Sequence, residues 1–190
     1  MNGPDRTPYR HLVQATLLAR PADAALAGDP NRFILATLIA GQAAGFGCLP
    51  ADLGLGQENF RQLFSRYFPG DPLVLTERVR IDIPEWEDLH KLLDHERANA
   101  GPATLWMASI VAHACAGSDH LWQDLGLSNR EQLTALMRIN FPTLADANNA
   151  DMKWKKFLYR QVCSREGIYV CPAPSCGVCT DFAKCFGPEN

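Results

Sequence analysis

The sequence RFILATLIAGQAA, residues 32–44, decides how the chain folds. It is apolar at nearly every position, so a helix built from it has no polar face to turn towards water. A membrane span is not expected, because the wider apolar stretch 33–49 is short and is diluted by Gln42, Cys48 and several small residues. We therefore expect residues 32–44 to form a buried central helix.

Other segments repeat apolar residues every three or four positions, which predicts amphipathic helices around this centre. They span residues 9–18, 59–68, 84–93, 102–117, 131–140 and 151–164. We expect Leu12 and Leu18 to face inwards from the first, Leu105 and His113 from the fourth. Residues 128–131 have the composition of a capping box led by Ser128. Only residues 73–75 and 168–170 are candidates for short strands.

Composition excludes several classes of protein. The chain has 190 residues and a formal net charge of −3. One domain of this length builds its core without disulfides, and the balance of charge opposes nucleic-acid binding. The first ten residues contain Pro, Asp and Arg where a secretory signal needs an apolar run. We expect a cytoplasmic protein that binds neither nucleic acid nor membrane.

The cysteines are concentrated near the C-terminus. Five of the seven lie between residues 163 and 185, and the last four have the spacing C-x4-C-x2-C-x5-C: Cys171, Cys176, Cys179 and Cys185. Four thiolates can hold one tetrahedral zinc ion or an iron-sulfur cluster. Structural zinc sites usually pair two C-x2-C knuckles, whereas this order is closer to ferredoxin-type ligation. The spacing favours iron-sulfur and leaves zinc open.

Three further residues are candidate metal ligands. Cys163 is either an additional ligand or a small buried side chain at a helix end. His95 and His120 lie beside acidic residues at predicted loop edges, where nitrogen and oxygen ligands could meet. Cys48 and Cys115 lie in apolar surroundings and are predicted to be core residues. No phosphate-binding loop, nucleophile elbow or catalytic triad can be recognised, so we expect a protein that is not an enzyme.

The C-terminal half resembles the NifQ family of nitrogen-fixation proteins. The similarity lies in the segment MKWKKFLYRQVC (residues 152–163), the four-cysteine motif, the ending Cys185-Phe186-Gly187, and HLWQDLGL (residues 120–127). It covers residues 80–190. With it, the expected organisation is an all-α, single compact helical domain over 1–166, with variable N-terminal helices in 1–80 and a family-like core in 81–166. Residues 167–190 form a cysteine-rich metal-binding loop.

The resemblance also implies a function. A NifQ-like protein binds a 3Fe-4S or 4Fe-4S cluster through the four-cysteine motif and carries molybdenum, received as molybdate or in reduced form. It donates the metal for biosynthesis of the iron-molybdenum cofactor, and its expected partners are the nitrogenase iron protein and the cofactor-assembly scaffold. Cys163, His120 and His95 are then possible molybdenum ligands. Two alternatives remain: a helical DNA glycosylase-like iron-sulfur protein, and a zinc-loop interaction module.

Overall fold

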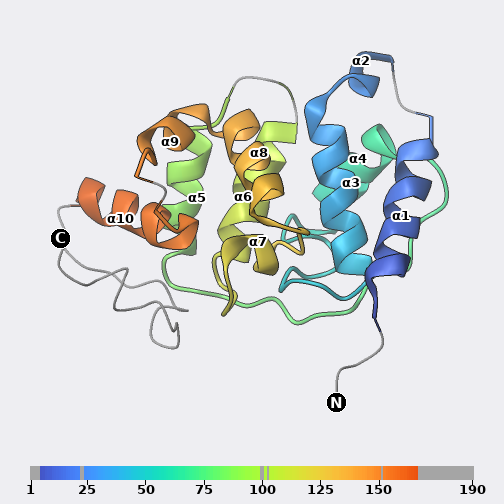
Figure 1. The fold of residues 1–190 in the computed structure, drawn as a ribbon, viewed down its shortest axis with the longest axis horizontal. Coiled ribbons are helices and arrows are strands. Elements are labelled where there is room, and N and C mark those ends of the chain that lie inside the picture. The colour runs from blue at the N-terminus through green and yellow to red at the C-terminus, as the bar shows by residue number, and fades with distance from the viewer. Residues whose placement is uncertain (1–4, 22–23, 99–100, 102, 151, 167–190) are drawn as a thin grey trace.

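The computed structural model describes residues 5–21, 24–98, 101, 103–150 and 152–166. These residues form ten helices and no strand (Figure 1). The all-α prediction is confirmed for this part of the chain. The helices are α1 (Thr7–Ala19), α2 (Ala24–Ala27), α3 (Pro30–Ala43), α4 (Gln57–Tyr67), α5 (Trp86–His95), α6 (Ala103–Ala114), α7 (Leu121–Asp124), α8 (Arg130–Asn140), α9 (Pro142–Ala147) and α10 (Trp154–Glu166).

Helices α3 and α6 are the centre of the fold. Every residue of α3 from Ile34 to Gln42 is buried, which confirms the central helix predicted from residues 32–44. Helix α6 is buried on most of its surface as well, although Leu105, which we expected to face inwards, is 50% exposed. Helix α1 packs against α3, and α5 packs against both α6 and α10. The helices thus follow one another across an elongated body (Figure 1).

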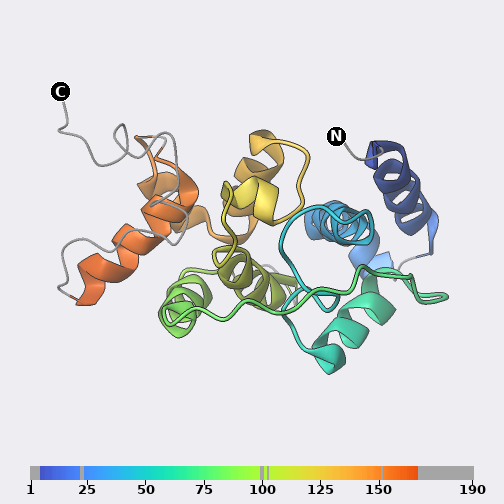
Figure 2. The ribbon, with the colours of Figure 1, turned by 90° about the horizontal axis from the view of Figure 1, so that it is seen from below.

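Residues 73–75 do not form the predicted strand. They belong to a segment that crosses the molecule from α4 to α5 without regular structure (Figure 2). The partner of this segment is a side chain: Gln42 of α3 accepts a hydrogen bond from the Thr76 amide at 3.0 Å and donates one to the Thr76 carbonyl oxygen. The Gln42 side chain forms hydrogen bonds with the backbone of only one residue of this segment. It therefore anchors the segment but cannot provide the repeated backbone hydrogen bonds that make a sheet. The second candidate, residues 168–170, lies outside the described residues.

The buried face of α1 differs from the predicted one. Leu12 is 64% exposed, whereas Arg10, Val13 and Leu17 are buried. These three residues also have helical spacing, but the first is charged, so they do not form the purely apolar stripe on which the prediction was based. In α8, predicted over residues 131–140, the buried residues are Leu133, Leu136, Met137 and Asn140, which have the helical spacing on which that prediction was based.

The N-terminal cap of α8 lies one residue later than in the capping box predicted for residues 128–131. Asn129, rather than Ser128, accepts from the backbone amide three residues later, that of Gln132, at 2.9 Å. The Gln132 side chain returns to the Ser128 amide at 2.7 Å. Asparagine caps a helix as well as serine does, and the glutamine gives the reciprocal bond expected from Glu131.

A buried cluster around Asp124, here named the Asp124 junction, joins four parts of the chain. Lys155 of α10 pairs with the Asp124 carboxylate and donates a second hydrogen bond to the Gly117 carbonyl oxygen at 2.8 Å. The Asp119 amide donates to the same carboxylate at 3.0 Å. The Cys48 amide donates to the Asp124 carbonyl oxygen at 2.9 Å. The junction therefore ties α7, the loop after α6 and the loop after α3 to the first turn of α10.

Small residues make this close packing possible. A Cβ atom on Gly117 would overlap the Asp124 carboxylate, and one on Gly41 of α3 would overlap the carbonyl oxygen of Gly126. Both obstacles are buried groups with little freedom to move, so neither glycine can be replaced by alanine without displacing the backbone or the ion pair.

We predict that Lys155→Met destabilises the protein far more than the same change at the exposed Lys91. Lys155 and Asp124 are 6% and 5% exposed, so removal of the ammonium leaves a buried, uncompensated carboxylate, at a cost of about 3–5 kcal/mol. Lys91 is 71% exposed, and its loss should cost no more than about 1 kcal/mol. Urea unfolding followed by circular dichroism measures both variants.

A double variant tests the physical reason. Lys155→Met combined with Asp124→Leu removes both charges, so it should be more stable than Lys155→Met alone. Equal unfolding free energies for Lys155→Met and Lys91→Met would show that the ion pair does not hold α10 in place.

Candidate functional site

The four-cysteine motif lies outside the described residues, so the structure does not place Cys171, Cys176, Cys179 or Cys185. It does place the helix that leads to them. Helix α10 ends at Glu166, and Cys171 follows five positions later (166 to 171). The structure therefore places the last described residue before the motif, at the end of α10.

Helix α10 is held at both ends. Near its start, Lys155 enters the Asp124 junction. Near its end, Arg165 pairs with Glu96, the residue that follows α5. Burial acts to raise the pKa of the Glu96 carboxyl, but its hydrogen bonds with Arg165 and His95 outweigh burial and lower the pKa. Between the two ends, the buried side chains of Phe157, Leu158, Tyr159 and Val162 attach the helix to the core.

Cys163 is a free thiol on the buried side of α10. It is 8% exposed and belongs to the same face as Val162. Of the two readings open from the sequence, this placement favours a small buried side chain over a ligand that faces solvent.

The two candidate histidines lie near opposite ends of α10. His95 is 73% exposed, and its Nδ1 atom is 3.0 Å from Glu96 Oε1, beside Arg165. His120 precedes α7, next to the Asp124 junction that holds Lys155. Lys155 and Arg165 are ten residues apart on one helix, a rise of about 15 Å. In the described part of the chain, no group of three or more His, Cys, Asp or Glu side chains could hold a metal ion.

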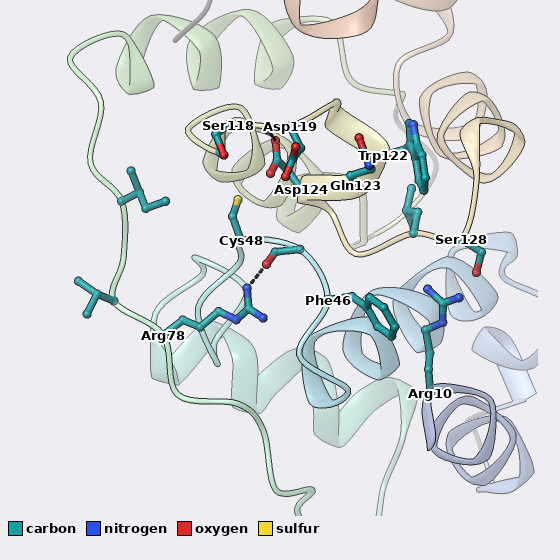
Figure 3. Close-up of a pocket in the computed structure, with 15 residues that line it drawn as sticks. Arg10, Phe46, Cys48, Arg78, Ser118, Asp119, Trp122, Gln123, Asp124 and Ser128 are labelled. Carbon is teal, nitrogen blue, oxygen red and sulfur yellow. Dashed lines mark hydrogen bonds between the residues drawn. The ribbon is translucent and has the colours of Figure 1, made fainter. Parts of the chain in front are cut away.

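A pocket of about 680 Å³ lies between α1, α7, the loop after α3 and the crossing segment (Figure 3). One part of its lining is acidic or polar, from Ser118, Asp119 and Asp124. Another part is basic and aromatic, from Arg10, Phe46 and Arg78. Burial raises the pKa of Asp124, against the opposing effect of the Lys155 ammonium. The pocket thus shares Asp124 with the junction that anchors α10.

The two arginines of the pocket differ in their partners. Arg78 donates to the carbonyl oxygens of Gly45 and Gly47, while its Nε atom has no partner. Arg10 stacks over the ring of Phe46, with 4.6 Å from its Cζ atom to the ring centre. Burial lowers the pKa of Arg10, and the exposed Asp5 acts in the opposite direction. Arg10 was absent from the site predicted from sequence.

Cys48 lines the same pocket and is held in its neutral form. Burial, followed by the nearby Asp124 carboxylate, raises the pKa of its thiol to about 12. Its Sγ atom lies 3.8 Å from the carbonyl oxygen of Ala114. Cys48 lies in the loop after α3 and is only half-buried, which corrects the prediction of a core residue. Cys115 is fully buried as predicted, and burial raises its pKa to about 12 as well.

Sequence analysis missed three buried charges that define these sites. Arg10, Asp124 and Lys155 each occupy a buried helical stripe. Lys155, for example, precedes Leu158 by three positions and Val162 by seven. This spacing could have indicated the buried charges from the sequence, since a charged residue within an apolar stripe is buried together with its partner or its ligand.

Comparison with known proteins identifies the family. The NifQ family model matches residues 34–187. The chain belongs to the NifQ family. The match begins well to the N-terminal side of residues 80–190, where the sequence showed its resemblance, and includes most of α3 and all of α4. It therefore covers the helical body from α3 onwards as well as the cysteine motif.

Individual NifQ proteins match most of the chain. Protein NifQ of Azotobacter vinelandii is 42% identical over 174 residues, which cover 84% of this chain and 89% of the relative. Protein NifQ of Rhodobacter capsulatus is 38% identical over 158 residues, covering 83% and 88%. A NifQ homologue of Sinorhizobium fredii is 34% identical over 192 residues, covering 96% and 83%. No solved structure matches the chain. Among the described residues, no helix is long and apolar enough to cross a bilayer.

We predict that Cys48 and Cys115 resist alkylation in the folded protein. With a pKa of about 12, roughly one thiol in ten thousand is ionised at pH 8, and the thiolate is the reactive form. Treatment with iodoacetamide at pH 8, followed by peptide mass spectrometry, should leave both unmodified. Unfolding in guanidinium should make both reactive, because their burial is lost. Rapid labelling of Cys48 in the native protein would contradict the raised pKa.

Proposed function

We propose that the protein carries molybdenum on an iron-sulfur cluster and donates it for biosynthesis of the nitrogenase iron-molybdenum cofactor. Membership of the NifQ family is the observation that carries this proposal. The four-cysteine motif supports it, since Cys171, Cys176, Cys179 and Cys185 provide the thiolate donors that such a cluster requires. The protein acts as a carrier, with no catalytic residue of its own.

The donor set fits a cluster of the 3Fe-4S or 4Fe-4S type. A cuboidal cluster that lacks one corner supplies three bridging sulfides, a soft site suited to reduced molybdenum. In this proposal the chain contributes the thiolates. Helix α10, which precedes the motif in sequence, is held on the body through Lys155 and Arg165.

The transfer partners we propose are the nitrogenase iron protein and the cofactor-assembly scaffold. A carrier must keep its cargo while it diffuses and release it on contact, which requires a metal site that a partner can reach. This requirement is consistent with a motif in a terminal segment rich in proline and glycine. A cytoplasmic location is part of the same proposal.

Metal analysis of Cys179→Ser tests the proposed function. We expect anaerobically purified wild-type protein to contain iron and molybdenum and to give an iron-sulfur EPR signal. Cys179→Ser should lose both metals together, because one cluster carries both. Cys115→Ala is the matched control, since Cys115 lies in the core. Wild-type protein with zinc, no iron and no visible charge-transfer absorption would replace the proposal by a zinc-loop interaction module.

A second series of variants identifies the additional molybdenum ligand among Cys163, His120 and His95. We expect His95→Gln to lower the ratio of molybdenum to iron, because His95 is exposed beside the end of α10 from which the motif continues. Cys163→Ser and His120→Gln should leave the ratio unchanged, since one is buried and the other lies near the opposite end of the helix. An unchanged ratio in His95→Gln removes His95 from the site.

A further inference from the structure

Arg10 is a buried cation that forms no ion pair with any acidic side chain among the described residues. It is 9% exposed, and its Nε atom has no hydrogen-bond partner. The nearest acidic influence comes from the exposed Asp5, whose carboxylate accepts from the Thr7 amide at 2.9 Å and forms no ion pair with Arg10. Burying an unpaired guanidinium is costly, so its retention in the stripe of α1 calls for a ligand.

The surroundings of Arg10 show where that ligand would lie. Its guanidinium is held over the Phe46 ring and lies towards Ser128 at one side of the pocket (Figure 3). Stacking on an aromatic ring fixes the plane of the guanidinium and leaves its N–H edge available. Ser128 adds a hydroxyl group to the same side. Both side chains can donate hydrogen bonds to a ligand on this side of the pocket.

The acidic residues of the pocket do not cancel this charge. Asp124 is paired with Lys155. It lies near Asp119 and Ser118, on a side of the pocket away from Arg10 (Figure 3). Arg78, across the pocket, also lines the cavity, although its terminal nitrogens are bound to carbonyl oxygens. An anion beside Arg10 therefore meets a fixed cation and a hydroxyl donor, while the carboxylates lie elsewhere.

We propose that this pocket binds a small tetrahedral oxyanion through Arg10, and that the anion is molybdate. The choice of molybdate rests on the proposed function; the choice of an oxyanion rests on the buried guanidinium and its donors. The two terminal nitrogens of a planar guanidinium can bind two oxygens of an oxyanion side by side, which neutralises the charge of Arg10. The pocket thus serves as an entry site for the oxidised metal, separate from the cysteine motif.

Titration with sodium molybdate tests the site. Isothermal calorimetry should show saturable binding to the wild-type protein, and molybdate should raise its melting temperature. Arg10→Met should bind at least about tenfold more weakly, since a charge-assisted hydrogen bond is lost. Arg61→Met is the matched control, because Arg61 is a 71% exposed arginine of α4. Molybdate binding by Arg10→Met equal to that of wild type would overturn the proposal.

The Arg10→Met variant should fold. It replaces an unpaired buried charge by an apolar side chain of similar length, so its melting temperature without anion should equal or exceed that of wild type. A lower melting temperature, with no anion effect in wild type, would show that Arg10 is structural and would overturn the proposal.

Further arms identify the anion and separate the two proposals. Molybdate and tungstate should bind at least as tightly as sulfate and phosphate; tighter binding of phosphate or sulfate would overturn molybdate as the occupant. Cys179→Ser should keep the Arg10-dependent titration while it loses iron. If wild-type protein lacks iron but binds molybdate through Arg10, the cluster proposal fails and this site stands. If wild-type protein carries iron and molybdenum but shows no Arg10-dependent binding of molybdate, the proposal of the oxyanion site fails and the cluster proposal stands.

Discussion

The buried ion pair between Lys155 and Asp124 is the interaction on which the placement of the C-terminal helix depends. Its two side chains join α10 to α7, and Lys155 also binds the backbone at Gly117. A buried pair of this kind contributes little net stability over an apolar pair, because desolvation offsets the attraction. The pair is, however, geometrically specific, because each buried charge is compensated only when the other side chain lies directly against it. We infer that it fixes the position of α10, the last described helix before the cysteine motif.

The same carboxylate links the two candidate sites. Asp124 lines the pocket that contains Arg10, and through Lys155 it holds the helix that leads to Cys171. In the further inference an oxyanion binds in the pocket, and in the proposed function molybdenum is carried at the cysteines. The described residues include the pocket, and they include helix α10, which precedes the cysteines in sequence. A change at the Asp124 junction would therefore affect both.

Amphipathic periodicity predicted the buried face of a helix correctly where that face is wholly apolar or ends in one neutral polar residue. The stripe of α8, from Leu133 to Asn140, is an example, and α3 is recognisable because it has no polar side. For α1 the helix was predicted correctly but its buried face was not, because the buried stripe contains the charged Arg10 and the expected face was chosen from apolar residues such as Leu12. Lys155 was overlooked for the same reason. Their burial depends on Phe46 and Asp124, which are distant in sequence, so local spacing alone does not reveal it.

Molybdenum K-edge X-ray absorption on anaerobically purified protein tests the central claim most directly, because it reports the atoms around the carried metal. The account predicts sulfur neighbours with iron beyond them in wild-type protein, and only oxygen neighbours in Cys179→Ser protein loaded with molybdate. Oxygen neighbours alone in the wild-type protein, with no iron nearby, would contradict the claim that the cysteine motif carries molybdenum on an iron-sulfur cluster.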